Sequence, residues 1–138
     1  LKDKPYMKNG RFFGYDICPE MIEKAQNMHG SDDRAFFEIL PFPNNMADYS
    51  FASGTFNMRA TASEESWTEF VKTSICEMYN KSKRGVAFNL LSQNNAQEEW
   101  LYYADANSFH QFCLSTLSEK SEIIFNKKET EFTILVTR

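Results

Sequence analysis

The residues best suited to bind a ligand stand at the ends of short apolar runs. Asp16 ends one such run and is soon followed by Pro19, a frequent first residue of a helix. A carboxylate at a strand end can accept hydrogen bonds from both hydroxyls of a ribose, but a turn or capping role explains Asp16 equally well. Ile17 would offer an apolar face to a purine, and it would look the same as a plain core residue.

Two further runs end in residues with similar potential. Glu38, Ile39 and Leu40 place an acid beside two apolar residues, which suits a ring with an exocyclic amine and also suits an ordinary strand end. Ser53 and Gly54 are small enough for a ligand to approach the backbone, although a tight turn uses the same residue types. The remaining candidates for ligand contact are Phe56, Asn57, Tyr102 and Tyr103.

The sequence has few residues that could bind a metal ion or act as a covalent catalyst. The two histidines are too few for a His-based metal site or a Ser-His-Asp arrangement, so no metal site is predicted. The three cysteines lie far apart, without a C-x-x-C pair and beside apolar neighbours, which is typical of reduced, mostly buried thiols in a cytoplasmic protein. Asn89 lies in an apolar run, so it is expected to be a buried polar group that needs hydrogen-bond partners, and its role is expected to be structural.

The composition is typical of a globular domain, and the charge excludes some classes of binding partner. The chain has 138 residues, of which 42% are hydrophobic and 25% charged, and this is enough for one compact domain rather than two. Its net charge is −4 and it has no stripe of Lys or Arg, so neither nucleic acid nor an anionic membrane is expected as a partner. Lys81, Lys83 and Arg84 are interpreted as the last turn of a helix. No run approaches the ~20 apolar residues of a membrane-spanning helix.

Predicted strands and helices alternate along the chain. Apolar runs predict strands over residues 11–17, 35–40, 48–54, 85–92, 122–126 and 131–137. Helical spacing predicts helices over 19–30, over about 63–83 with Ser63 as the cap and Gly85 as the stop, and from 105 or 107 onward. Strands that are apolar on both faces favour a mostly parallel sheet with helices on both faces, and the short link 127–130 requires an antiparallel C-terminal hairpin.

Taken in order, these segments resemble the class I S-adenosylmethionine-dependent methyltransferases. Residues 14–25, GYDICPEMIEKA, are similar to the family's second-strand motif, and residues 40–49 are similar to the stretch that leads into its fourth strand. Segments 51–57, 85–92 and 102–105 look like one subgroup of bacterial and archaeal methyltransferases. The resemblance implies a Rossmann-like α/β methyltransferase fold, with S-adenosylmethionine as the cofactor.

The resemblance also implies which residues form the site. Asp16 would bind the cofactor's ribose, apolar neighbours would border the adenine, and the residues after 52 would border the transferred methyl group. The expected cofactor-binding residues are Asp16, Ile17, Glu38, Ile39, Leu40, Ser53 and Gly54. The expected substrate-binding residues are Phe56, Asn57, Tyr102 and Tyr103.

One feature of the family has no match in this sequence. The family's first strand ends in an acid and a Gly-x-Gly loop, whereas residues 1–4 look like the end of the helix that follows that loop. We therefore expect one methyltransferase-like domain over residues 1–138 that is N-terminally incomplete and lacks the strand between its first and third visible strands. A sheet with that gap exposes two strand edges, so the chain is expected to be less stable than a full domain or to form a homodimer.

Methyl transfer from a sulfonium is a direct displacement, which needs alignment and desolvation more than a covalent catalyst. The lack of an evident nucleophile–base pair therefore agrees with a cytoplasmic methyltransferase that acts on a small-molecule acceptor, and no catalytic residue is predicted. Two alternatives stay open. One is a truncated or degenerate methyltransferase fold that binds no cofactor and serves as a structural or interaction module. The other, a nicotinamide-dependent Rossmann enzyme, does not explain the Asp-Ile-x-Pro-Glu-Met start of the first helix.

Overall fold

A computed structural model describes residues 8–95 and 98–138, and the chain divides into two compact units, Leu1–Asn45 and Met46–Arg138. Residues 1–4, interpreted above as a helix end, lie outside the described residues. The single methyltransferase-like domain expected over residues 1–138 stays a prediction.

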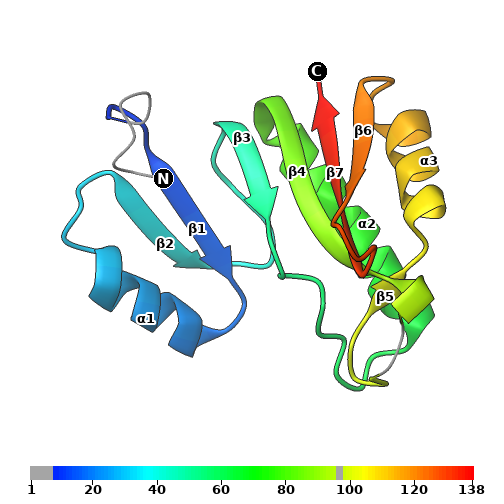
Figure 1. Cartoon of the computed structure of the whole chain (residues 1–138). Coiled ribbons are helices and arrows are strands. Elements are labelled where there is room, and N and C mark those ends of the chain that lie inside the picture. The colour runs from blue at the N-terminus through cyan, green and yellow to red at the C-terminus, as the bar shows by residue number, and fades with distance from the viewer. Residues whose placement is uncertain (1–7, 96–97) are drawn as a thin grey trace. The chain divides into compact units, whose positions relative to one another are not determined.

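The first unit is a strand–helix–strand arrangement (Figure 1). It consists of β1 (Phe12–Asp16), α1 (Pro19–His29) and β2 (Ala35–Ile39). The two strands pair in parallel, with Phe12 opposite Ala35 and Asp16 opposite Ile39. Helix α1 has proline at its first position and ends at Gly30, whose N–H donates to the carbonyl of Gln26 at 2.7 Å. The predicted order and types of these three elements are confirmed.

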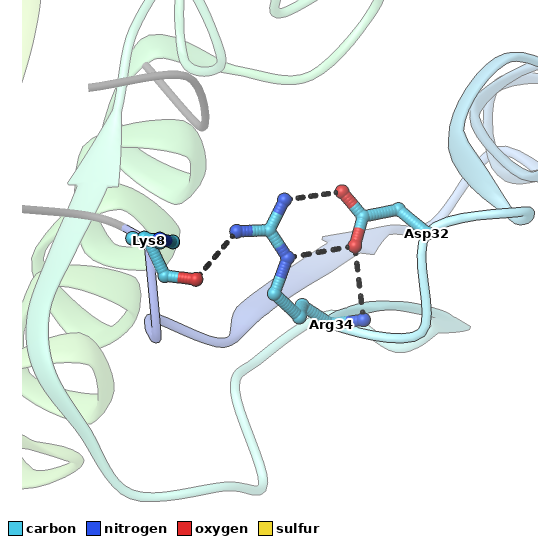
Figure 2. A network of polar contacts seen from close by, with 3 residues as sticks. All are labelled: Lys8, Asp32 and Arg34. Carbon is cyan, nitrogen blue, oxygen red and sulfur yellow. Dashed lines mark hydrogen bonds and ion pairs between the residues drawn. The ribbon is translucent and has the colours of Figure 1, made fainter. Parts of the chain in front are cut away.

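An arginine ties the start of β2 to the chain that precedes β1 (Figure 2). The Arg34 guanidinium donates to both carboxylate oxygens of Asp32, at 2.9 and 2.7 Å, and to the backbone carbonyl of Lys8 at 3.0 Å. Both side chains of the ion pair are mostly buried, with exposed fractions of 28% and 14%. The bidentate pair fixes the guanidinium within the turn before β2, and the third hydrogen bond connects this turn to Lys8.

The second unit is a mixed sheet with two helices (Figure 1). Its strands are β3 (Ala47–Ala52), β4 (Ser82–Ser92), β5 (Tyr103–Ala104), β6 (Ser121–Phe125) and β7 (Glu131–Thr137). Its helices are α2 (Glu64–Asn80) and α3 (Ala106–Thr116), and a short 3-10 turn covers Gln93–Asn95. Strands β3 and β5 run parallel to β4, and β7 is antiparallel to both β4 and β6. The expected antiparallel C-terminal hairpin is therefore confirmed.

The core of the second unit lies between one face of its sheet and the two helices. Alternate residues of β4 are buried, namely Val86, Phe88 and Leu90, as are Phe132, Ile134 and Val136 of β7. Helix α2 adds Val71, Ile75 and Met78 to this cluster, and α3 adds Phe109 and Cys113. The opposite face includes exposed apolar side chains, with Phe51 68% exposed and Ile124 51% exposed. Coverage of that second face by helices stays a prediction.

The end of the long helix differs from the prediction. Helix α2 ends at Asn80, and Lys83 and Arg84 lie in β4 instead of in the last helical turn. Gly85 does not stop a helix: it pairs with Tyr49 and Thr137 inside the sheet. A Cβ at this position would collide with the backbone carbonyl of Val136, so glycine is needed there for the close approach of β7.

Candidate functional site

In the first unit, Asp16 is the last residue of β1 and lies just before α1. Its Oδ1 accepts a hydrogen bond from the backbone N–H of Cys18 at 2.9 Å, which satisfies a donor at the start of the helix. The other oxygen, Oδ2, has no hydrogen-bond partner among residues 8–95 and 98–138. The carboxylate is thus held in place by one oxygen, while the second can still accept hydrogen bonds from a ligand.

Exposed apolar side chains stand beside this carboxylate at the carboxyl ends of β1 and β2. Ile17 is 62% exposed, and Ile39, the register partner of Asp16, is 54% exposed. Leu40 is half-buried, and its backbone N–H donates to the carbonyl of Asp16 at 3.2 Å. In parallel α/β sheets ligands bind beyond the carboxyl ends of the strands, and this end presents an acid next to an uncovered apolar surface.

A polar network fixes the loop that follows β2. The hydroxyl of Tyr15 donates to Oδ1 of Asn44 and accepts from Nδ2 of Asn45, each at 2.9 Å. Asn44 Nδ2 in turn donates to Oε2 of Glu38 at 3.1 Å. Because Tyr15 and Glu38 are register partners on adjacent strands, this network holds Glu38 close to the carboxyl ends of both. The structure thus brings the predicted residues of the first unit together at one sheet end.

In the second unit, Ser53 and Gly54 form a bend just after β3. Gly54 has a φ of +70°, a left-handed conformation that favours glycine. Its N–H donates to Oδ1 of Asn89 at 2.7 Å, and Nδ2 of Asn89 donates to Oε1 of Glu131 at 2.6 Å. An open pocket of about 190 Å³ lies here, lined in part by Phe51, Ser53, Asn89 and Glu131.

The other predicted residues of the second unit lie in and beside its core. Phe56 is only 3% exposed, and its carbonyl accepts from the indole N–H of Trp67 at 2.9 Å. Tyr102 is 2% exposed, its hydroxyl lies 2.7 Å from Oγ1 of Thr68, and burial raises the pKa of its phenol. Its N–H donates to the carbonyl of Asn57 at 2.8 Å, so the two predicted segments meet through their backbones.

Two polar atoms near these segments differ in how they are satisfied. The hydroxyl of Tyr103 accepts from the backbone N–H of Glu98 at 3.3 Å. Asn57 Oδ1 is buried and finds no hydrogen-bond partner within the described parts of the chain. The binding roles of Phe56, Asn57, Tyr102 and Tyr103 stay predictions.

Sequence reasoning missed the partners that hold the predicted residues. Neither Glu131 nor Tyr15 was a candidate. Tyr15 helps to fix the loop that contacts the candidate Glu38, and Glu131 orients Asn89, which in turn bonds the candidate Gly54. The only signal was a polar or amphipathic residue inside an apolar strand, and such a residue does not reveal its partner. The expectation that Asn89 has hydrogen-bond partners was correct, but the expected burial was wrong: Asn89 and Glu131 are half-buried and Gly54 is exposed, because Asn89 lies on the face of β4 opposite to its buried residues.

Residues 8–95 and 98–138 contain neither a metal-binding cluster nor a membrane-spanning helix. No group of three or more His, Cys, Asp or Glu side chains among them is arranged to hold a metal ion. None of the helices in residues 8–95 and 98–138 is long and apolar enough to cross a membrane.

Comparison with known proteins places the fold. The chain superposes on magnesium protoporphyrin IX methyltransferase (ChlM) from Synechocystis PCC 6803 with a TM-score of 0.62, at 11% identity, over 99% of this chain and 64% of that one. It superposes on the N-methyltransferase NodS from Bradyrhizobium japonicum WM9 with a TM-score of 0.67, at 11% identity, over 93% of this chain and 66% of that one. The chain thus spans about two thirds of these structures. Its fold is the Rossmann-like α/β fold of class I methyltransferases.

Sequence comparison gives the family. The chain is 30% identical, over 130 residues, to the Mycobacterium tuberculosis protein named "Putative methyltransferase Rv1506c", and the match covers 92% of this chain and 78% of that protein. No family model matches the chain. The chain belongs to the class I S-adenosylmethionine-dependent methyltransferase family.

Proposed function

We propose that this protein catalyses methyl transfer from S-adenosylmethionine to a small-molecule acceptor. The observation that carries the proposal is Asp16, which stands at the carboxyl end of β1 with one oxygen fixed by Cys18 and the other without a partner in the described chain. Such a carboxylate can accept hydrogen bonds from both hydroxyls of the cofactor's ribose. Family membership supports the same assignment.

The surroundings of Asp16 fit a nucleoside. Ile17 and Ile39 are both more than half exposed, so an adenine ring packed on them would remove apolar surface from water. Leu40 borders the same strand ends, and Glu38, held by Asn44, would offer an acceptor to the exocyclic amine. The five residues Asp16, Ile17, Glu38, Ile39 and Leu40 all belong to the first unit, and each is exposed or half-buried.

The second unit would supply the surroundings of the methyl group. S-adenosylmethionine carries this group on a sulfonium, and transfer needs an aligned acceptor in a site from which water is excluded. In this proposal Ser53 and Gly54 border the cofactor, while Phe56, Asn57, Tyr102 and Tyr103 shape the acceptor side. Within that group Asn57 is the residue with an unpartnered buried oxygen, Oδ1, so it is our choice for a hydrogen bond to the acceptor.

The negative net charge of the chain favours a small molecule as the methyl acceptor. The chain has 19 acidic and 15 basic residues, so its surface is a poor match for the phosphate backbone of a nucleic acid. We also propose that the protein is cytoplasmic. All three cysteines are free thiols, which is typical of proteins in that reducing compartment.

A second candidate function is a methyltransferase fold without cofactor binding that serves as an interaction module. Its supporting observation is the pair of exposed apolar side chains, Phe51 and Ile124, on the sheet face of the second unit opposite to its two helices. Exposed apolar side chains of this kind are a feature of protein interaction surfaces.

Calorimetric titration of the full chain with S-adenosylhomocysteine, the expected product, distinguishes the two functions. We expect saturable binding at one site per chain, which would contradict the module without a cofactor. Absence of heat from a protein that circular dichroism shows to be folded would contradict the methyltransferase assignment.

A further inference from the structure

The second unit contains a chain of three groups that the family resemblance does not explain. Gly54 N–H donates to Oδ1 of Asn89 at 2.7 Å, and Asn89 Nδ2 donates to Oε1 of Glu131 at 2.6 Å. Asn89 comes from the middle of β4, Gly54 from the bend after β3, and Glu131 from the first residue of β7. We call these three residues the amide relay.

The partners of Asn89 fix the direction of its side-chain amide. A backbone N–H can only donate and an ionised carboxylate can only accept, so Oδ1 must face Gly54 and Nδ2 must face Glu131. Both bonds are shorter than the usual 2.9 to 3.0 Å of N–H···O bonds, and the second is assisted by the charge of Glu131. Rotation of the amide would replace both bonds with repulsive contacts.

The relay determines what Gly54 contributes beside the pocket, whose lining includes its neighbour Ser53. Because its N–H is already bonded to Asn89, Gly54 offers a ligand its conformation and not this donor. A Cβ on Gly54 would meet no atom within 4 Å, so its left-handed φ of +70° is the feature that the turn requires. The hydrogen bond that Gly54 N–H donates to Asn89 Oδ1 holds this conformation, and with it the direction of the neighbouring Ser53.

We propose that Asn89 is a positioning residue: it fixes the bend at Ser53 and Gly54 in the conformation that binds the cofactor, and Glu131 sets the direction of its amide. This inference rests on the proposed function, since it concerns the same strand end. Ser53, Asn89 and Glu131 line one open pocket together with strand residues that include Phe51, Ala87 and Thr133, so a change in the relay alters the wall that a ligand meets.

The relay can be tested by exchanging the amide and the carboxylate between positions 89 and 131. Asn89→Asp keeps an oxygen for Gly54 but sets a second carboxylate against Glu131, and two adjacent carboxylates resist joint ionisation. The double variant Asn89→Asp with Glu131→Gln restores the pair, because the glutamine amide can donate to the new carboxylate. In Glu131→Gln alone, the amide oxygen of the new glutamine can still accept from Asn89 Nδ2.

The measurement is the affinity of the full chain for S-adenosylhomocysteine at pH 8, by calorimetry. We expect Asn89→Asp to bind at least about tenfold more weakly, and the double variant and Glu131→Gln to bind within about threefold of the unaltered protein. We also expect binding by Asn89→Asp to recover as the pH falls toward 5, since one proton then bridges the two carboxylates. Asn126→Asp adds the same charge to the β6–β7 link and should leave the affinity unchanged. The Asn126 side chain bonds Thr130, and the hydrogen bond from the Asn126 N–H to the carbonyl of Glu131 is made by the backbone and does not depend on that side chain.

Hydrogen exchange of the Gly54 amide, followed by NMR, reports the relay without any cofactor. Protection in the unaltered protein and in the double variant, with faster exchange in Asn89→Asp, supports the inference. Equal affinity of Asn89→Asp and the unaltered protein would overturn it, and so would a double variant with a protected Gly54 amide that still binds weakly. If the unaltered protein binds no S-adenosylhomocysteine, the proposed function fails and the positioning role fails with it; a failure of the inference alone leaves that binding intact.

Discussion

Asp16 Oδ1 and the backbone N–H of Cys18 lie 2.9 Å apart, so the carboxylate that we assign to the ribose also anchors the start of α1. Asp16→Asn keeps an oxygen for this anchor and removes the charge. Hydrogen bonds to charged groups are worth about 1.5 to 3 kcal/mol, so we expect the affinity for S-adenosylhomocysteine to fall roughly 10- to 100-fold with little loss of stability. Calorimetry and thermal unfolding of the same preparation measure both.

Asp33→Asn is the matched control for this substitution. Asp33 is an exposed acid in the turn before β2, at the end of the strands opposite to Asp16. Asp33→Asn removes one negative charge from the same unit as Asp16→Asn does. A similar loss of affinity in both variants would therefore contradict a direct contact between Asp16 and the ribose.

The hydroxyl of Tyr15 should contribute measurably to stability. Tyr15→Phe removes the acceptor of Asn45 Nδ2 and the donor to Asn44 Oδ1 without changing the ring. A net hydrogen bond contributes about 1 kcal/mol, so we expect the free energy of unfolding in urea to fall by about 1 to 2 kcal/mol, with an unchanged m-value. Tyr49→Phe is the control, because the Tyr49 hydroxyl has no hydrogen bond in the described parts of the chain. Equal losses in the two variants would count against the network.

The order of the elements could be predicted because each one leaves a local signature. Pro19 marks the start of α1, and the Oγ of Ser63 accepts from the N–H of Ser66 at the start of α2, as expected of a cap. The four-residue spacing of Val71 and Ile75 correctly predicted the buried stripe of α2. Signals of this kind depend on neighbours within one or two turns of chain, which a sequence displays directly.

The remaining features depend on partners that are distant in sequence. Asn89 and Glu131 are 42 residues apart, and they meet because β4 and β7 pair in one particular register. Tyr15 and Asn44 are 29 residues apart. Gly85 followed a helix and therefore looked like its stop, whereas its actual constraint is the backbone of β7 about 50 residues later. Candidate residues could thus be named from the sequence, but not the groups that hold them.

Gly85 should tolerate substitution far less well than Gly54. Gly85→Ala places a methyl group against the carbonyl of Val136 inside a paired strand, and such overpacking costs typically 1 to 3 kcal/mol or more, so we expect a loss of about 3 kcal/mol. Gly54→Ala meets open space and pays only for its left-handed φ, about 1 kcal/mol. Urea unfolding measures both variants, and a smaller loss for Gly85→Ala than for Gly54→Ala would show that β7 can move away from Gly85.

Cys113 should make the protein less stable at alkaline pH. Its thiol is fully buried in the core of the second unit, and this burial raises its pKa from 9.0 to about 12. The folded protein therefore keeps the thiol proton where the unfolded chain releases it, so the stabilisation is complete below pH 9 and is lost progressively between pH 9 and about 12. Between pH 8 and pH 10 we expect this thiol to account for a loss of about 1 kcal/mol in the free energy of unfolding.

Burial also raises the pKa values of Tyr102 and Cys76, so these groups lower the stability at alkaline pH as well. Cys113→Ala removes only the contribution of Cys113 and therefore isolates it. The variant should be less stable than the unaltered protein at pH 7, since it leaves a small cavity, but its stability should fall less steeply as the pH rises to 10. Urea unfolding at several pH values under reducing conditions gives both slopes. Identical slopes would mean that Cys113 reaches solvent in the folded state, and iodoacetamide would then label it at pH 8 as fast as it labels the half-buried Cys18.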